Sequence, residues 1–127
     1  MARPMTEALI DSHDAALFDL DGVVYLGSEV VPAAPATMSR LRARGVGVGF
    51  VTNNAARATT VVADQLTDMG IPAAPSDVVS SAEAVTALVA TELGQGTRVL
   101  IAATSNVDDL ARQRGLVPVH SADEHPQ

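Results

Sequence analysis

Two aspartates, Asp19 and Asp21, stand one residue apart directly after a short apolar run, in the string FDLDGVVY. Because side chains alternate along a strand, both carboxylates would lie on one face, roughly 7 Å apart at about 3.3 Å per residue. Carboxylates held so closely repel each other and lose hydration. A fold therefore keeps them where a cation neutralises them or where they act as distinct acid and base. Mg²⁺ is the cation that we expect for such oxygen donors.

Further polar groups follow this strand and the next one. Gly22 comes directly after the second aspartate and permits a sharp turn whose backbone N–H groups approach an anion. The string VTNN ends the next apolar run with the hydroxyl of Thr52 and with further donors from Asn53 and Asn54. Together with the aspartates, these groups predict a phosphate cradle beside a magnesium site.

Apolar runs alternate with helical spacing along the chain. Short apolar runs predict strands at 15–20, 46–51, 77–79, 98–103 and 116–119. Apolar residues at helical spacing predict four helices, which contain in turn Ala34, Met38 and Leu41; Val62, Leu66 and Met69; Val85 to Leu93; and Val107 to Ala111. Gly45 and Gly70 predict helix ends, Ser80 with Glu83 predicts a capping box, and Ser105 predicts an N-cap. Such alternation favours an α/β fold with a parallel sheet, whose sites lie at the carboxyl ends of the strands.

Composition excludes several classes of function. The 127 residues are 47% hydrophobic, enough for one compact domain, and they carry a formal charge of −7 without any lysine. That charge, together with only two Phe, one Tyr and no Trp, argues against a nucleic-acid partner. The absence of cysteine excludes disulfides and thiolate metal sites, and the first fifteen residues lack the apolar run of a signal peptide or membrane span. We therefore expect a cytoplasmic protein with no membrane partner.

At the motifs quoted above the chain resembles the haloacid dehalogenase superfamily, whose first motif is Asp-x-Asp-Gly and whose second is a Thr or Ser that ends the next strand. The longer strings FDLDGVVYLG, GFVTNNAAR and DVVSSAEAV are similar to its class IIA branch, the nitrophenylphosphatase and phosphoglycolate phosphatase relatives. The resemblance implies a Rossmann-like core and a cap. It divides the chain into a flexible N-terminus at 1–14, the first half of the core at 15–80, the beginning of a C2-type cap at 81–119 and a disordered tail at 120–127.

The resemblance also implies a role for each site residue. Asp19 would attack phosphorus, become an aspartyl phosphate and bind Mg²⁺. Asp21 would act as general acid and base and offer its backbone carbonyl to the metal. Thr52 and the amide of Asn53 would hold the phosphoryl oxygens, with Gly22 as a nearby backbone donor. The substrate would be a small phosphorylated metabolite.

Two parts of the family's site do not occur in this sequence. The third motif needs a basic residue, yet there is no lysine, and Arg98, Arg112 and Arg114 fall in the segment expected to form the cap. The fourth motif needs an acidic pair in a Gly-Asp context, which the neighbours of Asp123 and Glu124 do not match. We therefore expect a truncated chain with half of a site and little activity by itself.

Other interpretations of the same residues stay open. An Asp-Gly pair is common in ordinary turns, Thr52 could cap the following helix, and Tyr25 could either line the site or simply pack its ring. A phospho-receiver domain also uses clustered aspartates, a Thr and Mg²⁺, although Val79 stands where its acceptor would be and its lysine is missing. A catalytically inactive interaction module would pair an exposed sheet edge with another chain or a second copy, giving a homo-oligomer.

Overall fold

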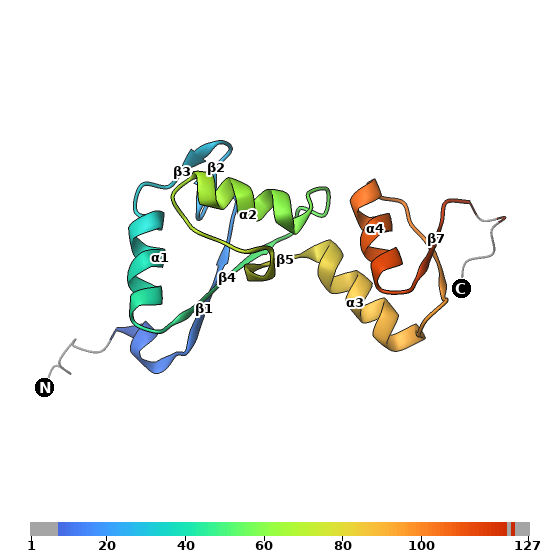
Figure 1. The fold of residues 1–127 in the computed structure, drawn as a ribbon, viewed down its shortest axis with the longest axis horizontal. Helices are drawn as coiled ribbons and strands as arrows, with labels where there is room; N and C mark the ends of the chain where they lie inside the picture. Colours follow the sequence, from blue (N-terminus) through green and yellow to red (C-terminus); the bar gives the residue numbers. More distant parts are fainter. Residues whose placement is uncertain (1–7, 122, 124–127) are drawn as a thin grey trace, which may run out of the picture.

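The computed structural model describes residues 8–121 and residue 123. These residues form two lobes, shown in Figure 1. The first lobe, residues 15–80, holds a sheet with its covering helices. The second lobe, residues 81–119, holds two helices and a two-stranded sheet, and the chain passes between the lobes where strand β5 runs directly into helix α3.

The first lobe contains the predicted parallel sheet. Its strands are β1 (Ala15–Asp19), β4 (Gly47–Thr52) and β5 (Val78–Ser80), in the order β1-β4-β5, and both pairings are parallel. The order confirms the expected α/β class, because each strand returns beside the previous one after a helix has crossed the sheet.

Helices α1 (Ala34–Ala43) and α2 (Thr59–Asp68) cover one face of this sheet. Phe18, Phe50 and Val78 lie side by side in register on that face, and Phe50 is fully buried. Gly45, predicted to end the first helix, has a φ of +77°, which an L side chain rarely adopts. The core around Phe50 consists mainly of small and aliphatic side chains: Leu20, Val24, Tyr25, Ala34, Met38, Val62, Ala63, Leu66, Ile71 and Val78.

No element of the described residues covers the opposite face of the sheet, which we call the open face and define by Leu17, Asp19, Val51 and Val79. Leu17 is 74% exposed, Val51 42% and Val79 47%. The register places Asp19 opposite Val51 and Val51 opposite Val79, so the three form one row across the sheet. The outer edges of β1 and β5 are also unpaired among the described residues.

Short elements that the sequence did not predict fill the connections. The loop after β1 contains the antiparallel hairpin of β2 (Tyr25–Leu26) and β3 (Glu29–Val30), and a 3₁₀ turn, η2 (Pro75–Asp77), precedes β5. Another 3₁₀ turn, η1 (Leu9–Ser12), lies in the segment predicted to be irregular. An ion pair between Arg44 and Asp11 ties η1 to the end of α1.

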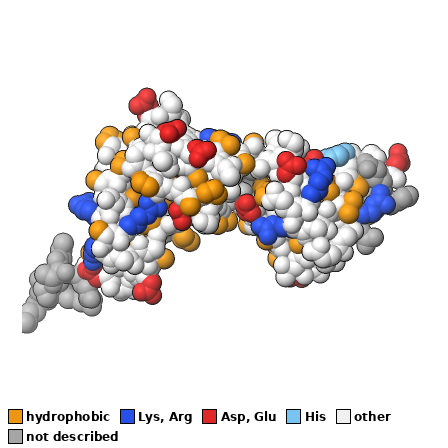
Figure 2. Space-filling model, in the orientation of Figure 1, with side chains coloured by type: hydrophobic (Ala, Val, Ile, Leu, Met, Phe, Trp, Pro, Cys, Tyr) orange, Lys and Arg blue, Asp and Glu red, His pale blue; other side chains and the backbone are white. Residues whose placement is uncertain are grey.

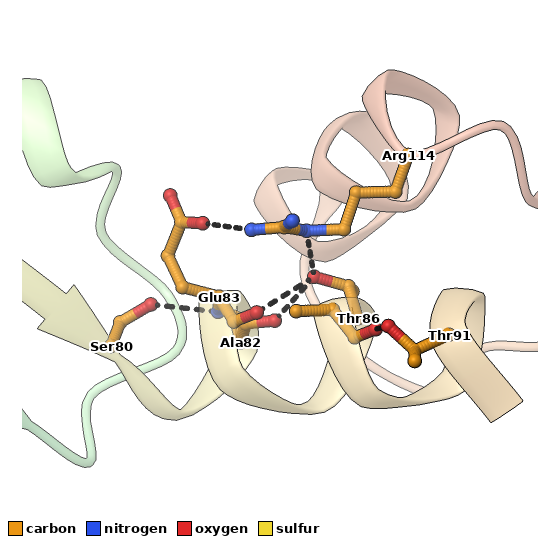
Figure 3. A network of polar contacts seen from close by, with 7 residues as sticks. Ser80, Ala82, Glu83, Thr86, Thr91 and Arg114 are labelled. Carbon is orange, nitrogen blue, oxygen red and sulfur yellow. Dashed lines mark hydrogen bonds and ion pairs between the residues drawn. The ribbon is translucent and has the colours of Figure 1, made fainter.

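The second lobe consists of α3 (Ser81–Leu93), β6 (Arg98–Leu100), α4 (Ser105–Gln113) and β7 (Val117–Val119), with β6 and β7 parallel. Arg114 joins its two helices, as Figure 3 shows. Its guanidinium donates to the Thr86 hydroxyl at 3.1 Å and to the Glu83 carboxylate at 2.7 Å. Ser80 caps α3 by accepting the backbone N–H of Glu83 at 3.1 Å, which is the first half of the predicted capping box. The second half is not formed in the structure, where the Glu83 carboxylate pairs with Arg114.

Some predicted boundaries were wrong. The strand predicted at 98–103 ends at Leu100, and residues 101–104 form a loop. Ser105 is the first residue of α4, so Thr104 takes the N-cap position and its side chain makes no capping hydrogen bond. An apolar run by itself does not separate a strand from the loop that continues it, and this explains the first error.

Charged side chains are scattered over both lobes on the face shown in Figure 2 rather than gathered into a basic patch. Among the described residues, none of the helices has the length and apolar content needed to cross a bilayer. The predictions for residues 1–7 and for most of the tail, including Glu124, lie outside the described residues.

Phe50→Ala should lower the free energy of unfolding by about 3–5 kcal/mol, because it removes a fully buried ring at the centre of the core. Leu17→Ala, on the neighbouring strand but on the open face, should change it by no more than about 0.5 kcal/mol. Urea denaturation followed by circular dichroism measures both. Equal losses would mean that the open face is covered in solution.

Candidate active site

Asp19 and Asp21 lie at the carboxyl end of β1, and both are exposed. Leu20 between them is completely buried, and the register of β1 with β4 places the Asp19 carboxylate on the side away from the helices. One carboxylate oxygen of Asp19, Oδ1, accepts the backbone N–H of Leu20 at 2.9 Å. The second oxygen of Asp19 and the Asp21 carboxylate make no hydrogen bond or ion pair to the described part of the chain. Three carboxylate oxygens are thus available to a ligand.

A tight turn follows the aspartates and is closed by the Leu20 carbonyl, which accepts the N–H groups of Val23, Val24 and Tyr25 at 2.9–3.3 Å. Gly22 makes this turn possible with a φ of +82°. Its N–H donates to the Tyr25 carbonyl at 2.8 Å. The predicted role of Gly22 as a backbone donor to phosphate was therefore wrong, because its N–H already has a partner inside the turn.

The loop that follows β4, residues 53–58, is organised by its own side chains. Thr52 is 5% exposed, and its Oγ1 accepts the N–H of Asn54 at 3.1 Å. The side chain of Asn54 in turn accepts the N–H of Ala56 at 3.0 Å and so orients the loop. Because Thr52 Oγ1 is an acceptor in this turn, its hydroxyl hydrogen is available to an incoming anion. The N–H of Asn53 makes no hydrogen bond within the described residues.

The register of the sheet brings Asp19 and Thr52 to the same edge of the sheet. Asp19 lies opposite Val51 in the parallel pair, and Thr52 follows Val51 directly. Neighbouring strands are about 4.8 Å apart, so Asp19 and Thr52 end adjacent strands at the same edge. They approach that edge from different sides, since Asp19 is on the open face and Thr52 is on the side covered by helices.

The free oxygen atoms suit a hard cation. The backbone carbonyl of Asp21 accepts no hydrogen bond from the described residues, and together with the free Asp19 oxygen it supplies two of the oxygen ligands that Mg²⁺ prefers. In residues 8–121 and 123 no three acidic, His or Cys side chains gather as a metal site. The donor set present here therefore fits Mg²⁺ but is only part of a coordination shell.

Two further residues, Tyr25 and Arg57, follow the two motifs closely in sequence. Tyr25 is buried, at 4% exposure, and burial raises the pKa of its hydroxyl. The negative charges of Asp21 and Asp19 raise this pKa further, while the positive charge of Arg57 lowers it. Arg57, in the loop after β4, is thus a cation whose charge acts on the Tyr25 hydroxyl, and the search for a basic residue overlooked it. It follows the VTNN motif by only a few positions, which is a signal that could have identified it.

A family model described as haloacid dehalogenase-like hydrolase matches residues 16–117. The chain belongs to this family. The match covers both lobes, and with it the resemblance inferred from the aspartates and the VTNN motif is confirmed.

Members of the family that resemble this chain are phosphatases. D-glycerol 3-phosphate phosphatase of Mycobacterium tuberculosis is 37% identical over 120 residues, which are 94% of this chain and 33% of that protein. Acid sugar phosphatase of Staphylococcus aureus is 34% identical over 113 residues, which are 89% of this chain and 42% of that protein. The chain thus spans less than half the length of either relative.

Solved structures agree with this membership. A glycerol phosphate phosphatase from Mycobacterium tuberculosis in complex with magnesium superposes with a TM-score of 0.84 at 37% identity, over 94% of this chain and 36% of that one. A 4-nitrophenylphosphatase from Thermotoga maritima superposes with a TM-score of 0.82 at 22% identity and shares the fold. This hydrolase fold is therefore the one predicted.

Tyr25 is the only tyrosine of a chain without tryptophan, so the ultraviolet absorbance of its tyrosinate reports its pKa directly. Asp21→Asn should lower this pKa, because a neighbouring negative charge disfavours the tyrosinate. Arg57→Gln should raise it, because the stabilising positive charge is lost. Asp14→Asn, at the opposite end of β1, serves as the control and should leave it unchanged. An unchanged midpoint in Asp21→Asn would contradict the arrangement.

Proposed function

We propose that this chain provides the nucleophile half of a Mg²⁺-dependent phosphomonoester hydrolase site. The observation that carries the proposal is the pair of exposed carboxylates, Asp19 and Asp21, at the end of β1 beside the Thr52 loop. The phosphatase names of its relatives agree with it. Because the chain spans only a third of the mycobacterial relative, hydrolysis by the whole protein is part of this proposal as well.

Asp19 is the proposed nucleophile. Its oxygen that accepts no hydrogen bond attacks phosphorus, the bond from phosphorus to the leaving oxygen breaks, and an aspartyl phosphate forms. The N–H of Leu20 holds the other carboxylate oxygen, so one oxygen is positioned and the other is left to react. This division favours Asp19 as the attacking group.

Asp21 is the proposed acid and base. Its carboxyl group gives a proton to the departing alkoxide, and the resulting carboxylate then takes a proton from the water that attacks the phosphoryl group. The second step breaks the bond between phosphorus and Asp19, releases phosphate and restores both starting groups. No hydrogen bond ties the Asp21 side chain to described residues, so it can face either oxygen in turn.

Thr52 and Asn53 are the proposed phosphate contacts. The Thr52 hydroxyl hydrogen and the Asn53 N–H are donors without a partner among the described residues, and both follow the carboxyl end of β4. Donors fixed before the substrate arrives stabilise the charge that develops on phosphoryl oxygens. Gly22 contributes the turn rather than a donor.

Mg²⁺ would be held by the Asp19 carboxylate and the Asp21 carbonyl and would neutralise charge on the nucleophile and the phosphoryl group. Residues 81–119 are proposed as the start of the cap, which in this family faces the site. The substrate class proposed is a small phosphorylated metabolite, in line with the activities that the names of the relatives state.

Asp19→Asn should reduce hydrolysis of a chromogenic phosphate ester in the presence of Mg²⁺ to the background rate, because an amide cannot form the aspartyl phosphate. Asp14→Asn, an exposed acid at the other end of β1, should retain the rate of the unaltered chain. Release of nitrophenolate measures both. Hydrolysis that persists in Asp19→Asn would rule out this nucleophile.

The open face favours a second candidate function, that of an interaction module. Leu17, Val51 and Val79 form an apolar patch beside an unpaired strand edge, and such surfaces are covered in most proteins. The occupant proposed is a second copy of this chain, whose own open face offers the same apolar side chains.

If two copies pair through this face, light scattering after size exclusion should give the mass of a dimer, and Leu17→Asp should reduce it to that of a monomer. Leu9→Asp is the matched control, since Leu9 is 82% exposed but lies on η1. A monomeric mass for the unaltered chain would exclude this function and leave the hydrolase proposal unaffected.

A further inference from the structure

Two side chains of the second lobe reach the loop that follows Thr52. The hydroxyl of Ser81, the first residue of α3, donates to the backbone carbonyl of Asn53 at 3.1 Å. The side-chain amide of Asn106, in the first turn of α4, donates to the carbonyl of Ala55 at 2.8 Å across 51 positions of sequence. Figure 1 shows this loop, drawn in green between β4 and α2, extending towards α4.

Neither the Ser81 nor the Asn106 side chain caps the helix to which it belongs. An Asn or Ser near the start of a helix usually accepts one of the free N–H groups there. In α3, Ser80 makes the capping hydrogen bond. In α4, the N-cap residue makes no side-chain capping bond, and the Asn106 amide donates to the first lobe. Helix capping therefore does not account for the residue type at either position.

Both carbonyls belong to peptide groups that already hold the loop together. In a trans peptide the carbonyl and the following N–H point in opposite directions, and the described chain has no cis bonds. The peptide that accepts Ser81 donates its Asn54 N–H to Thr52 Oγ1 at 3.1 Å. The peptide that accepts Asn106 donates its Ala56 N–H to Asn54 Oδ1 at 3.0 Å.

We propose that Ser81 and Asn106 are positioning residues that hold the Asn54-ordered loop so that Thr52 and Asn53 are in place for phosphate. They act through the two peptide groups, each fixed on both sides by a hydrogen bond. A peptide that accepts one hydrogen bond becomes a stronger donor in the next, so the two bonds support each other. The inference rests on the proposed function, because it assigns a partner to the proposed phosphate-binding loop.

The arrangement links the placement of the second lobe to the site. Hydrogen bonds of this kind are lost beyond about 3.5 Å, so a shift of α4 by about 1 Å releases the Ala55 peptide. The Ala56 N–H is then no longer oriented towards Asn54, and the loop loses its second support. The order of the phosphate-binding loop therefore depends on the position of the second lobe.

The first arm of the test measures the contacts without any activity. In amide NMR spectra of the 127-residue chain, Asn106→Ala should move the Ala56 N–H resonance and speed its exchange with solvent by about three- to tenfold. Ser81→Ala should do the same to Asn54, and Ser81→Thr, which keeps the hydroxyl, should restore it. Ser105→Ala is the matched control, since Ser105 is exposed beside Asn106 and its side chain makes no hydrogen bond to the described residues. Unchanged resonances in Asn106→Ala would overturn the inference.

The second arm titrates inorganic phosphate in the presence of Mg²⁺. Asn106→Ala and Ser81→Ala should each weaken phosphate binding by about fivefold, while Ser81→Thr and Ser105→Ala bind as the unaltered chain does. Equal binding by Asn106→Ala would overturn the positioning role even if its resonances moved. Failure of the unaltered chain to bind phosphate would instead reject the proposed function, and the first arm would still decide whether the two contacts hold the loop.

Discussion

Phe18 of β1 lies opposite Phe50 of β4, and this contact beneath α1 and α2 determines where every group of the candidate site stands. Side chains alternate along a strand, so fixing these two rings on the side of the helices sends Asp19 to the other side and carries Thr52 to the end of the adjacent strand. A shift of one residue would turn the aspartates into the core. The position of the chemistry is therefore set by apolar packing, not by the polar groups that perform it.

The sequence was sufficient for those features that depend on local periodicity. Alternation in FDLD predicted the face of the sheet that Asp19 takes. Helical spacing, together with a terminal glycine or with Ser80, predicted three of the helices closely. The sequence was insufficient for those features that are determined by hydrogen bonds between backbone groups. Nothing in the residue type of Gly22 indicates that its N–H is used by the Tyr25 carbonyl, and two-residue strands such as β2 are too short for a pattern. Arg57 was overlooked because its effect on Tyr25 depends on the path of a loop, which periodicity does not encode.

Asp19, Asp21 and Thr52 all belong to the first lobe, yet the loop beside them is not maintained by that lobe alone. Ser81 and Asn106 bring support from segments that begin after the sheet has ended. Inside the second lobe, Arg114 holds α3 against α4, so a change at this arginine would reach the loop through both of those contacts. A rigid connection between the lobes is consistent with a β5 strand that passes into α3 without an intervening loop.

The open face also affects the solubility of this chain. Leu17, Val51 and Val79 are exposed together, and at neutral pH a formal charge of −7 keeps molecules apart by mutual repulsion. With 15 acidic and 8 basic residues, this repulsion fades as the carboxylates take up protons in mildly acidic solution. Solubility should therefore reach its minimum in weak acid, and added salt, which screens the same repulsion, should widen the range of pH over which the protein precipitates.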